Sequence, residues 1–262
     1  MWAMVFAILL LGVSALSAQQ AETAAAVAAG LPKEGVRPSP APLPAAALTP
    51  EMRGDIFMAR KMYREAIEMY QTGPRDSAVL LNKIGIAYHQ LLELDEARKY
   101  YERALKLNPK YAEAINNLGT VHYAKKNYRK AVGQYKKALK LAPNSASIYS
   151  NLGTAQFARK KYKDAVEAYQ KALALDPDVF EHRNAHGVLL QERSVEERAK
   201  FHYYLAKVYA KTGVVDRALL YLRKALEEGF RERDKIKDEP EFAALRELPE
   251  FQELLTLEPR VL

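Results

Sequence analysis

The sequence predicts an all-α, right-handed superhelical solenoid of helix-turn-helix units that ends in a helical cap. A pattern of small residues, aromatic residues and prolines recurs through residues 78–177 with a period of 34 residues. The markers Ala97, Tyr101, Ala104 and Pro109 recur as Ala131, Tyr135, Ala138 and Pro143, and again as Ala165, Tyr169, Ala172 and Pro177. The apolar content of 49% is ample for a core formed by stacked units.

Each unit has the pattern of two amphipathic helices joined by a short turn. A glycine stands at the same place in every first helix, where it costs roughly 1 kcal/mol relative to alanine. These glycines are Gly85, Gly119 and Gly153. A cost repeated at one phase indicates that a second helix approaches closely, and the tyrosines of the second helices are expected to fill the gap. Because one unit cannot bury its apolar face alone, stability must come from stacking of neighbours.

A period of 34 residues with this pattern resembles the tetratricopeptide repeat family. The resemblance runs from about Gly54 to Phe230 and implies a superhelix whose first helices line a concave groove. It divides the chain into full repeats over 78–111, 112–145 and 146–179, a degenerate first repeat over 51–77 and a further repeat over 199–232. The last of these has Ala206, Leu222 and Phe230 where the others have glycine, tyrosine and proline.

The N-terminal residues have the composition of a secretory signal peptide, here assigned to 1–20. Met1–Ala21 has no charged side chain, Trp2–Val13 is apolar, and small residues follow. No basic residue stands near Met1, so an uncleaved anchor and a mistranslated start remain as alternatives. We expect cleavage and a periplasmic or secreted protein of bacterial type, with no transmembrane span in the mature chain. The Ala- and Pro-rich residues 21–50 read as a semi-rigid linker.

Two segments break the repeat pattern near the C-terminus. Residues 180–198 are predicted to form an irregular insertion. Near its end, Ser194 and Glu197 have the spacing of a capping box, which predicts the start of a helix. Residues 233–262 carry two Pro-Glu helix starts and are predicted to cap the last repeat with short helices. The apolar face of the cap consists of Phe242, Leu245, Leu248, Phe251, Leu254 and Leu255.

Few residues have the pattern of a catalytic or metal site. The chain has no cysteine, no glycine-rich phosphate loop and no nucleophile elbow. His182 and His186 are four residues apart, but no third metal ligand stands near them, and a solvated loop is the simpler interpretation. The sequence therefore predicts a protein that is not an enzyme and has no metal and no cofactor.

The candidate binding residues lie at the inward phases of the first helices. They are Asn82, Ile86, His89, Asn116, Asn117, Thr120, Tyr123, Ser150, Asn151, Thr154 and Phe157. In the repeats of O-GlcNAc transferases, which these units resemble, asparagines at the phase of Asn117 and Asn151 bind the backbone of an extended peptide. The other interpretation is that these asparagines only tie helices together, and a buried amide needs partners in either case. The lysines of a chaperone-tail receptor are absent at Asn82, Asn116 and Ser150.

A basic cluster marks the middle repeat. Residues 78–177 hold 18 basic and 8 acidic residues, a net of +10. The cluster consists of Lys125, Lys126, Arg129, Lys130, Lys136, Lys137 and Lys140, and we expect it on the convex face. A solvated charged face is the ordinary interpretation.

The predicted function is a non-catalytic scaffold in the cell envelope that binds a protein or extended peptide of unknown identity in the groove. The alternative is association of the basic face with a polyanion or an anionic membrane surface. No specific nucleic acid is implied.

Overall fold

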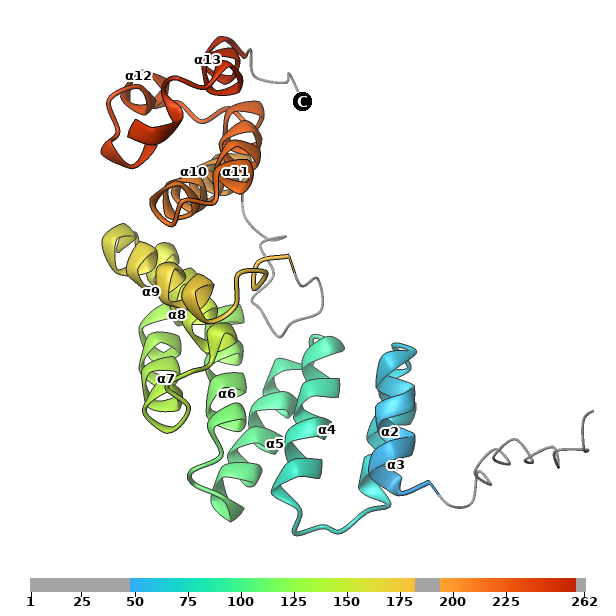
Figure 1. The fold of residues 1–262 in the computed structure, drawn as a ribbon. Helices are drawn as coiled ribbons and strands as arrows, with labels where there is room; N and C mark the ends of the chain where they lie inside the picture. Colours follow the sequence, from blue (N-terminus) through green and yellow to red (C-terminus); the bar gives the residue numbers. More distant parts are fainter. Residues whose placement is uncertain (1–47, 182–193, 258–262) are drawn as a thin grey trace, which may run out of the picture. The chain divides into compact units, whose positions relative to one another are not determined.

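The computed structural model describes residues 48–181 and 194–257, and within these ranges the regular elements are all helices. Figure 1 shows them as a succession of helix pairs. The elements are α2 (Pro50–Ala59), α3 (Tyr63–Gln71), α4 (Ala78–Gln90), α5 (Leu94–Leu107), α6 (Ala112–Ala124), α7 (Tyr128–Leu141), α8 (Ala146–Ala158), α9 (Tyr162–Leu175), α10 (Val195–Lys211), α11 (Val215–Glu227), α12 (Arg233–Ile236), the 3₁₀-helix η3 (Pro240–Leu245) and α13 (Pro249–Thr256).

The helices pack as pairs, and the pairs pack on one another. The first and second helices of a unit contact each other in α2–α3, α4–α5, α6–α7, α8–α9 and α10–α11. Each second helix then contacts the next first helix, as in α3–α4, α5–α6 and α7–α8. The first helices α4, α6 and α8 also touch in succession. The predicted all-α solenoid of stacked helix pairs is confirmed.

Each pair closes where a tyrosine of the second helix lies against a glycine of the first. A Cβ atom built on Gly85 would lie 2.5 Å from Cε1 of Tyr101, and one built on Gly153 would lie 2.4 Å from Cε1 of Tyr169. No real side chain tolerates such a distance, so the expected close approach of the two helices is present. Gly54 of α2 has the same relationship to Tyr70 of α3, so the α2–α3 pair closes in the same way as the full repeats.

The turn inside each pair has one residue in the left-handed region. Its φ is close to +60° at Lys61, Leu92, Lys126 and Lys160, and +80° at Gly213. The amide of the next residue donates to a carbonyl five residues earlier, as in Asn127 N–His122 O at 2.8 Å. This bond pattern ends the first helix and turns the chain into the second.

The last helix pair begins with α10. Ser194 caps it, because the Ser194 hydroxyl accepts a hydrogen bond from the Glu197 amide at 3.2 Å. The helix starts at Val195 and therefore includes four residues of the predicted insertion 180–198. The longer helix places Phe201 and Tyr203 in the core beside α9 and the cap.

The C-terminal elements cover the last pair. η3 packs on α10, and α13 packs on α11. Phe242, Leu245, Phe251 and Leu254 are almost fully buried in the same core as α10 and α11. The first of the two capping helices is a 3₁₀-helix, and the short α12 precedes it. The cap thus shields apolar surface that a further repeat would otherwise cover.

The predicted signal peptide, nearly all of the predicted linker, and His182 with His186 lie outside the described residues. The sequence predicts that the linker ends at residue 50, but Pro50 already begins α2, with Thr49 as its N-cap. No helix in 48–181 or 194–257 has both the length and the apolar character that a membrane span requires.

Candidate functional site

Burial separates the candidate groove residues into two groups. Seven are buried in the stack: Asn82, Asn116, Asn117, Thr120, Asn151, Thr154 and Phe157. Four are partly exposed: Ile86, His89, Tyr123 and Ser150. Only the second group offers surface to a partner without a change in the fold, and we call it the first-helix surface.

The buried asparagines form a hydrogen-bonded chain across three repeats, which we call the asparagine ladder. Asn151 Nδ2 donates to Asn116 Oδ1 at 3.1 Å, and Asn117 Nδ2 donates to Asn82 Oδ1 at 3.0 Å. A longer contact of 3.4 Å from Asn116 Nδ2 to Asn117 Oδ1 joins the two bonds. The ladder therefore links α8 to α6 and α6 to α4.

The ladder bears on the two interpretations of Asn117 and Asn151. Both amides are less than a tenth exposed, and each donates to the preceding repeat. These bonds agree with the interpretation that the asparagines tie helices together. A hydrogen bond from either amide to a bound peptide stays a prediction, and it would require the ladder to rearrange.

Hydroxyl groups continue the polar contacts beside the ladder. Thr120 Oγ1 donates to the Asn117 carbonyl at 2.7 Å and lies 3.4 Å from His89 Nδ1 of the preceding repeat. Burial lowers the pKa of His89. His89 is therefore a neutral side chain at physiological pH, and the first-helix surface carries no histidine charge there.

Aromatic rings flank the accessible residues. The ring of Tyr123 lies 5.2 Å from that of Tyr128 at the start of α7. Phe157, its counterpart in the next repeat, is buried and has Tyr162 at 5.3 Å and Phe201 at 5.7 Å. Tyr123 is thus the ring at this phase that remains accessible in the middle repeats.

The predicted basic cluster lies at the end of α6 and along α7. All seven side chains belong to exposed residues. Lys125 pairs with Asp95 at 2.5 Å. Within the described ranges the other six make no ion pair with a carboxylate. We call these seven residues the α7 basic face.

The described residues contain no cluster of three or more side chains that could hold a metal ion. His202 lies 2.7 Å from Glu228, and burial lowers its pKa although Glu228 acts in the opposite direction. This pair joins α10 to α11 inside the last repeat.

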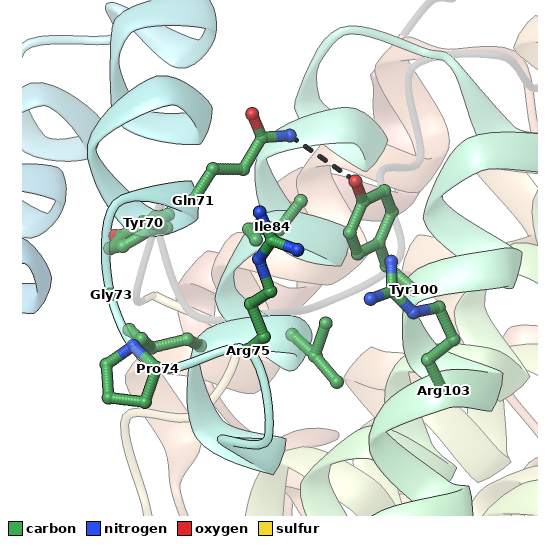
Figure 2. Close-up of a pocket in the computed structure, with 10 residues that line it drawn as sticks. Tyr70, Gln71, Gly73, Pro74, Arg75, Ile84, Tyr100 and Arg103 are labelled. Atoms are coloured by element: carbon green, nitrogen blue, oxygen red, sulfur yellow. Dashed lines mark hydrogen bonds between the residues drawn. The ribbon is translucent and has the colours of Figure 1, made fainter.

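A pocket of about 400 Å³, which the repeat pattern does not predict, is bordered by α3, α4 and α5. Figure 2 shows Arg75 and Arg103 among the residues that line it, with the Gln71–Tyr100 hydrogen bond beside them. None of these residues follows the repeat pattern, so periodicity could not reveal them. The equivalent residues of the next repeat are Gln134 and Lys137. The departure of Tyr100 and Arg103 from these residues is the feature of the sequence that could have indicated the pocket.

Comparisons with known proteins place the repeats in a family. Models of the tetratricopeptide repeat match residues 78–111 and 111–178. No relative matches among curated proteins.

Several solved structures resemble the chain at low identity. A MamA structure is 22% identical, with a TM-score of 0.46 over 70% of this chain and 96% of that chain. MamA 41-end from Desulfovibrio magneticus RS-1 is also 22% identical, with a TM-score of 0.46 over 71% and 93% of the two chains. The first TPR of Spaghetti (RPAP3), bound to the HSP90 peptide SRMEEVD, is 26% identical, with a TM-score of 0.39 over 41% and 86%. The assignment therefore rests on the repeat models and on the stacked helix pairs, and residues 78–178 belong to the tetratricopeptide repeat family.

Proposed function

We propose that the chain is a non-catalytic scaffold that binds a protein or an extended peptide along the first-helix surface. The observation that carries this proposal is the alignment of α4, α6 and α8. Three first helices touch in succession and present Ile86, His89, Tyr123 and Ser150 at inward phases, and His89 and Tyr123 share one of these phases. A surface that continues from one repeat to the next suits a partner that is itself extended.

The asparagine ladder supports this function by holding the surface in one geometry. Its bonds run between repeats, so they oppose sliding of α4, α6 and α8 past one another. A preorganised surface loses less conformational entropy when a partner binds. Tyr123 supplies an accessible aromatic side chain, the kind that often anchors an interface. Ser150 supplies a hydroxyl that both donates and accepts hydrogen bonds.

Affinity capture with paired variants tests the proposal. The full chain is immobilised, envelope extract is passed over it, and retained proteins are identified by mass spectrometry. Tyr123→Ala combined with Ser150→Lys should abolish retention of the partner, because both changes fall on the first-helix surface. Lys136→Ala combined with Lys137→Ala on α7 is the control and should retain it. Melting curves of the variants verify that the repeats stay folded, and a partner indifferent to the first pair would refute the proposal.

We place the scaffold in the bacterial cell envelope. The support is the uncharged Met1–Ala21 followed by the Ala- and Pro-rich residues 21–50. Mass spectrometry of the native protein should find an N-terminus close to residues 19–25. Recovery of intact Met1 from a cytosolic fraction would contradict this location.

The second candidate function is association of the α7 basic face with an anionic surface. The observation that favours it is the exposure of Lys126, Arg129, Lys130, Lys136 and Lys137 without an ion pair among the described residues. Binding to vesicles that contain phosphatidylglycerol should then weaken steeply with salt, because phosphate contacts release counterions. Lys136→Glu with Lys137→Glu should abolish it. Vesicle binding that ignores salt would exclude this function.

A further inference from the structure

The pocket between α3, α4 and α5 combines an apolar floor with a basic rim. Leu80, Leu81 and Ile84 of α4 line the floor, and all three are less than a tenth exposed. Arg75, from the loop between α3 and α4, and Arg103, from α5, line the rim. In Figure 2 the two side chains extend in a similar direction, Arg75 beside Ile84 and Arg103 beside Tyr100.

The polar groups of the rim leave positive charge available. The guanidinium of Arg103 lies 5.0 Å from the ring centroid of Tyr100, which positions it by a cation–π contact. Gln71 Nε2 donates to the Tyr100 hydroxyl at 3.3 Å and fixes the other edge of the ring. In the part of the chain that the structure describes, neither Arg75 nor Arg103 forms an ion pair with a carboxylate.

Tyr100 and Arg103 of this pocket do not recur at the next junction between helix pairs. At the next junction Gln134 and Lys137 replace Tyr100 and Arg103, while Leu118 keeps the apolar character of Ile84. An apolar floor is therefore a property of the stack, whereas the aromatic wall and the paired guanidinium groups are local additions. Structural packing alone does not require two exposed arginines at this opening.

We propose that this pocket binds an organic carboxylate whose charged group is joined to an apolar body. The guanidinium groups of Arg75 and Arg103 would hold the carboxylate, since arginine presents paired donors that match carboxylate oxygens. The apolar body would lie on Leu80, Leu81 and Ile84. The site shares no residue with the first-helix surface and goes beyond the function proposed for that surface. Its volume is within the range of small-ligand pockets.

Titration of the ¹⁵N-labelled full chain by NMR tests the site with 3-phenylpropionate as the probe. Amides of residues 71–84 and 100–103 should shift. The neutral analogue 3-phenylpropanamide should bind about tenfold more weakly, because it loses the charge-assisted hydrogen bonds. Acetate, which lacks the apolar body, should leave these amides unchanged. Equal binding of the acid and the amide would overturn the proposal, as would an absence of shifts at millimolar acid.

Variants assign the binding to the two guanidinium groups. Arg75→Gln and Arg103→Gln should each weaken 3-phenylpropionate binding several-fold, while the exposed positions keep the melting temperature unchanged. Lys137→Gln, at the same phase one repeat later, is the matched control and should have no effect. If neither arginine variant weakens binding, the assignment is wrong.

Two probes distinguish the possible sources of the carboxylate. The blocked peptide acetyl-Leu-Glu-Leu-amide, titrated in the same way, represents an acidic side chain of a partner protein. Shifts of residues 71–84 and 100–103 that vanish in Arg103→Gln assign the pocket to such a segment. Shifts with 3-phenylpropionate alone assign it to a small organic acid. The capture experiment with Tyr123 and Ser150 variants reports on the other surface, so the two proposals fail separately.

Discussion

A Cβ atom built on Gly119 of α6 would lie 2.5 Å from Cε1 of Tyr135 on α7. The tyrosine ring therefore occupies the space that a side chain at residue 119 would need. In the last repeat Ala206 and Leu222 stand at these two phases, and both are fully buried. Ala206 is larger than Gly119, and Leu222 is smaller than Tyr135. The two changes compensate, as expected if the two side chains of each pair fill one shared volume.

The shared volume can be measured with a double-mutant cycle. Gly119→Ala should lower the free energy of unfolding by about 1–3 kcal/mol, because the methyl group overpacks the site. Gly119→Ala with Tyr135→Leu, which reproduces the Ala206–Leu222 pair, should cost less than the sum of the single changes. Urea unfolding of the four proteins gives the coupling free energy. Strict additivity would show that the two residues do not compete for space.

Two tyrosines at the same phase differ in their hydroxyl groups. Tyr169 Oη donates to Thr154 Oγ1 at 3.3 Å, whereas Tyr135 Oη is buried with no partner among the described residues. Tyr169→Phe should therefore cost about 1 kcal/mol of unfolding free energy. Tyr135→Phe should be neutral or stabilising, because it removes an unsatisfied polar group. Thermal or urea melts of both variants decide the matter, and an equal loss would mean that Tyr135 Oη has a partner such as ordered water.

The left-handed residue of each turn gives a third prediction. Gly213 has a φ of +80°, and its counterpart Lys160 has a φ of +60°. Gly213→Ala should cost about 1 kcal/mol, because a side chain in this conformation is strained. Lys160→Gly should be close to neutral, because relief of strain is offset by the greater freedom of glycine in the unfolded chain. Calorimetric melting of both variants measures whether each substitution stabilises or destabilises the fold. A higher melting temperature for Gly213→Ala would contradict the prediction.

The attachment of the cap should depend on pH through Glu239. Lys207 Nζ lies 2.6 Å from Glu239 Oε2, and Tyr203 Oη donates to Oε1 at 2.5 Å. Burial raises the pKa of Glu239, but the hydrogen bonds from Lys207 and Tyr203 outweigh it and hold the pKa below the ordinary value of 4.5. A carboxylate with a depressed folded-state pKa stabilises the fold above the unfolded-state value and loses that contribution as the pH falls through the folded-state value.

Acid should therefore loosen the cap below about pH 4.5. Glu239→Gln should flatten the dependence of the melting temperature on pH in this range, since the substituted side chain does not titrate. Glu253→Gln, at an exposed position beyond the first turn of α13, is the control and should change the profile much less. Identical profiles for wild type and Glu239→Gln would show that other carboxylates dominate acid unfolding.

Periodicity predicted the fold because the glycine, alanine and tyrosine positions recur with the packing that they make. The asparagine ladder was harder to predict. Its two long-range bonds join residues that are 35 apart, one more than the repeat period of 34. Each bond therefore joins two residues that do not occupy equivalent positions in their repeats. Comparing equivalent positions of the repeats shows which residues recur, but it does not show that Asn117 forms a hydrogen bond with Asn82. The pocket could not be predicted for the opposite reason, because Arg75, Tyr100 and Arg103 do not recur at equivalent positions.

The asparagine ladder supports a last prediction, which distinguishes energetic coupling between repeats from a local loss of stability at the substituted residue. Asn116 lies at its centre, since it accepts from Asn151 at 3.1 Å and contacts Asn117 at 3.4 Å. Asn116→Leu has a similar volume but removes the acceptor of Asn151 and a donor to Asn117. A buried polar group deprived of its partner costs about 1–3 kcal/mol. The loss should appear as a lower free energy of unfolding for the whole array.

Ser150 provides the matched control, because it occupies the phase of Asn116 in the next repeat and is partly exposed. Ser150→Ala should change the free energy of unfolding little. Hydrogen exchange should show faster opening of α4, α6 and α8 in Asn116→Leu, because both inter-repeat amide bonds converge on α6. If exchange increases only within α6, then the ladder is a local contact. If all three helices respond together, then the asparagines couple the repeats, and a ligand on the first-helix surface meets a single cooperative unit.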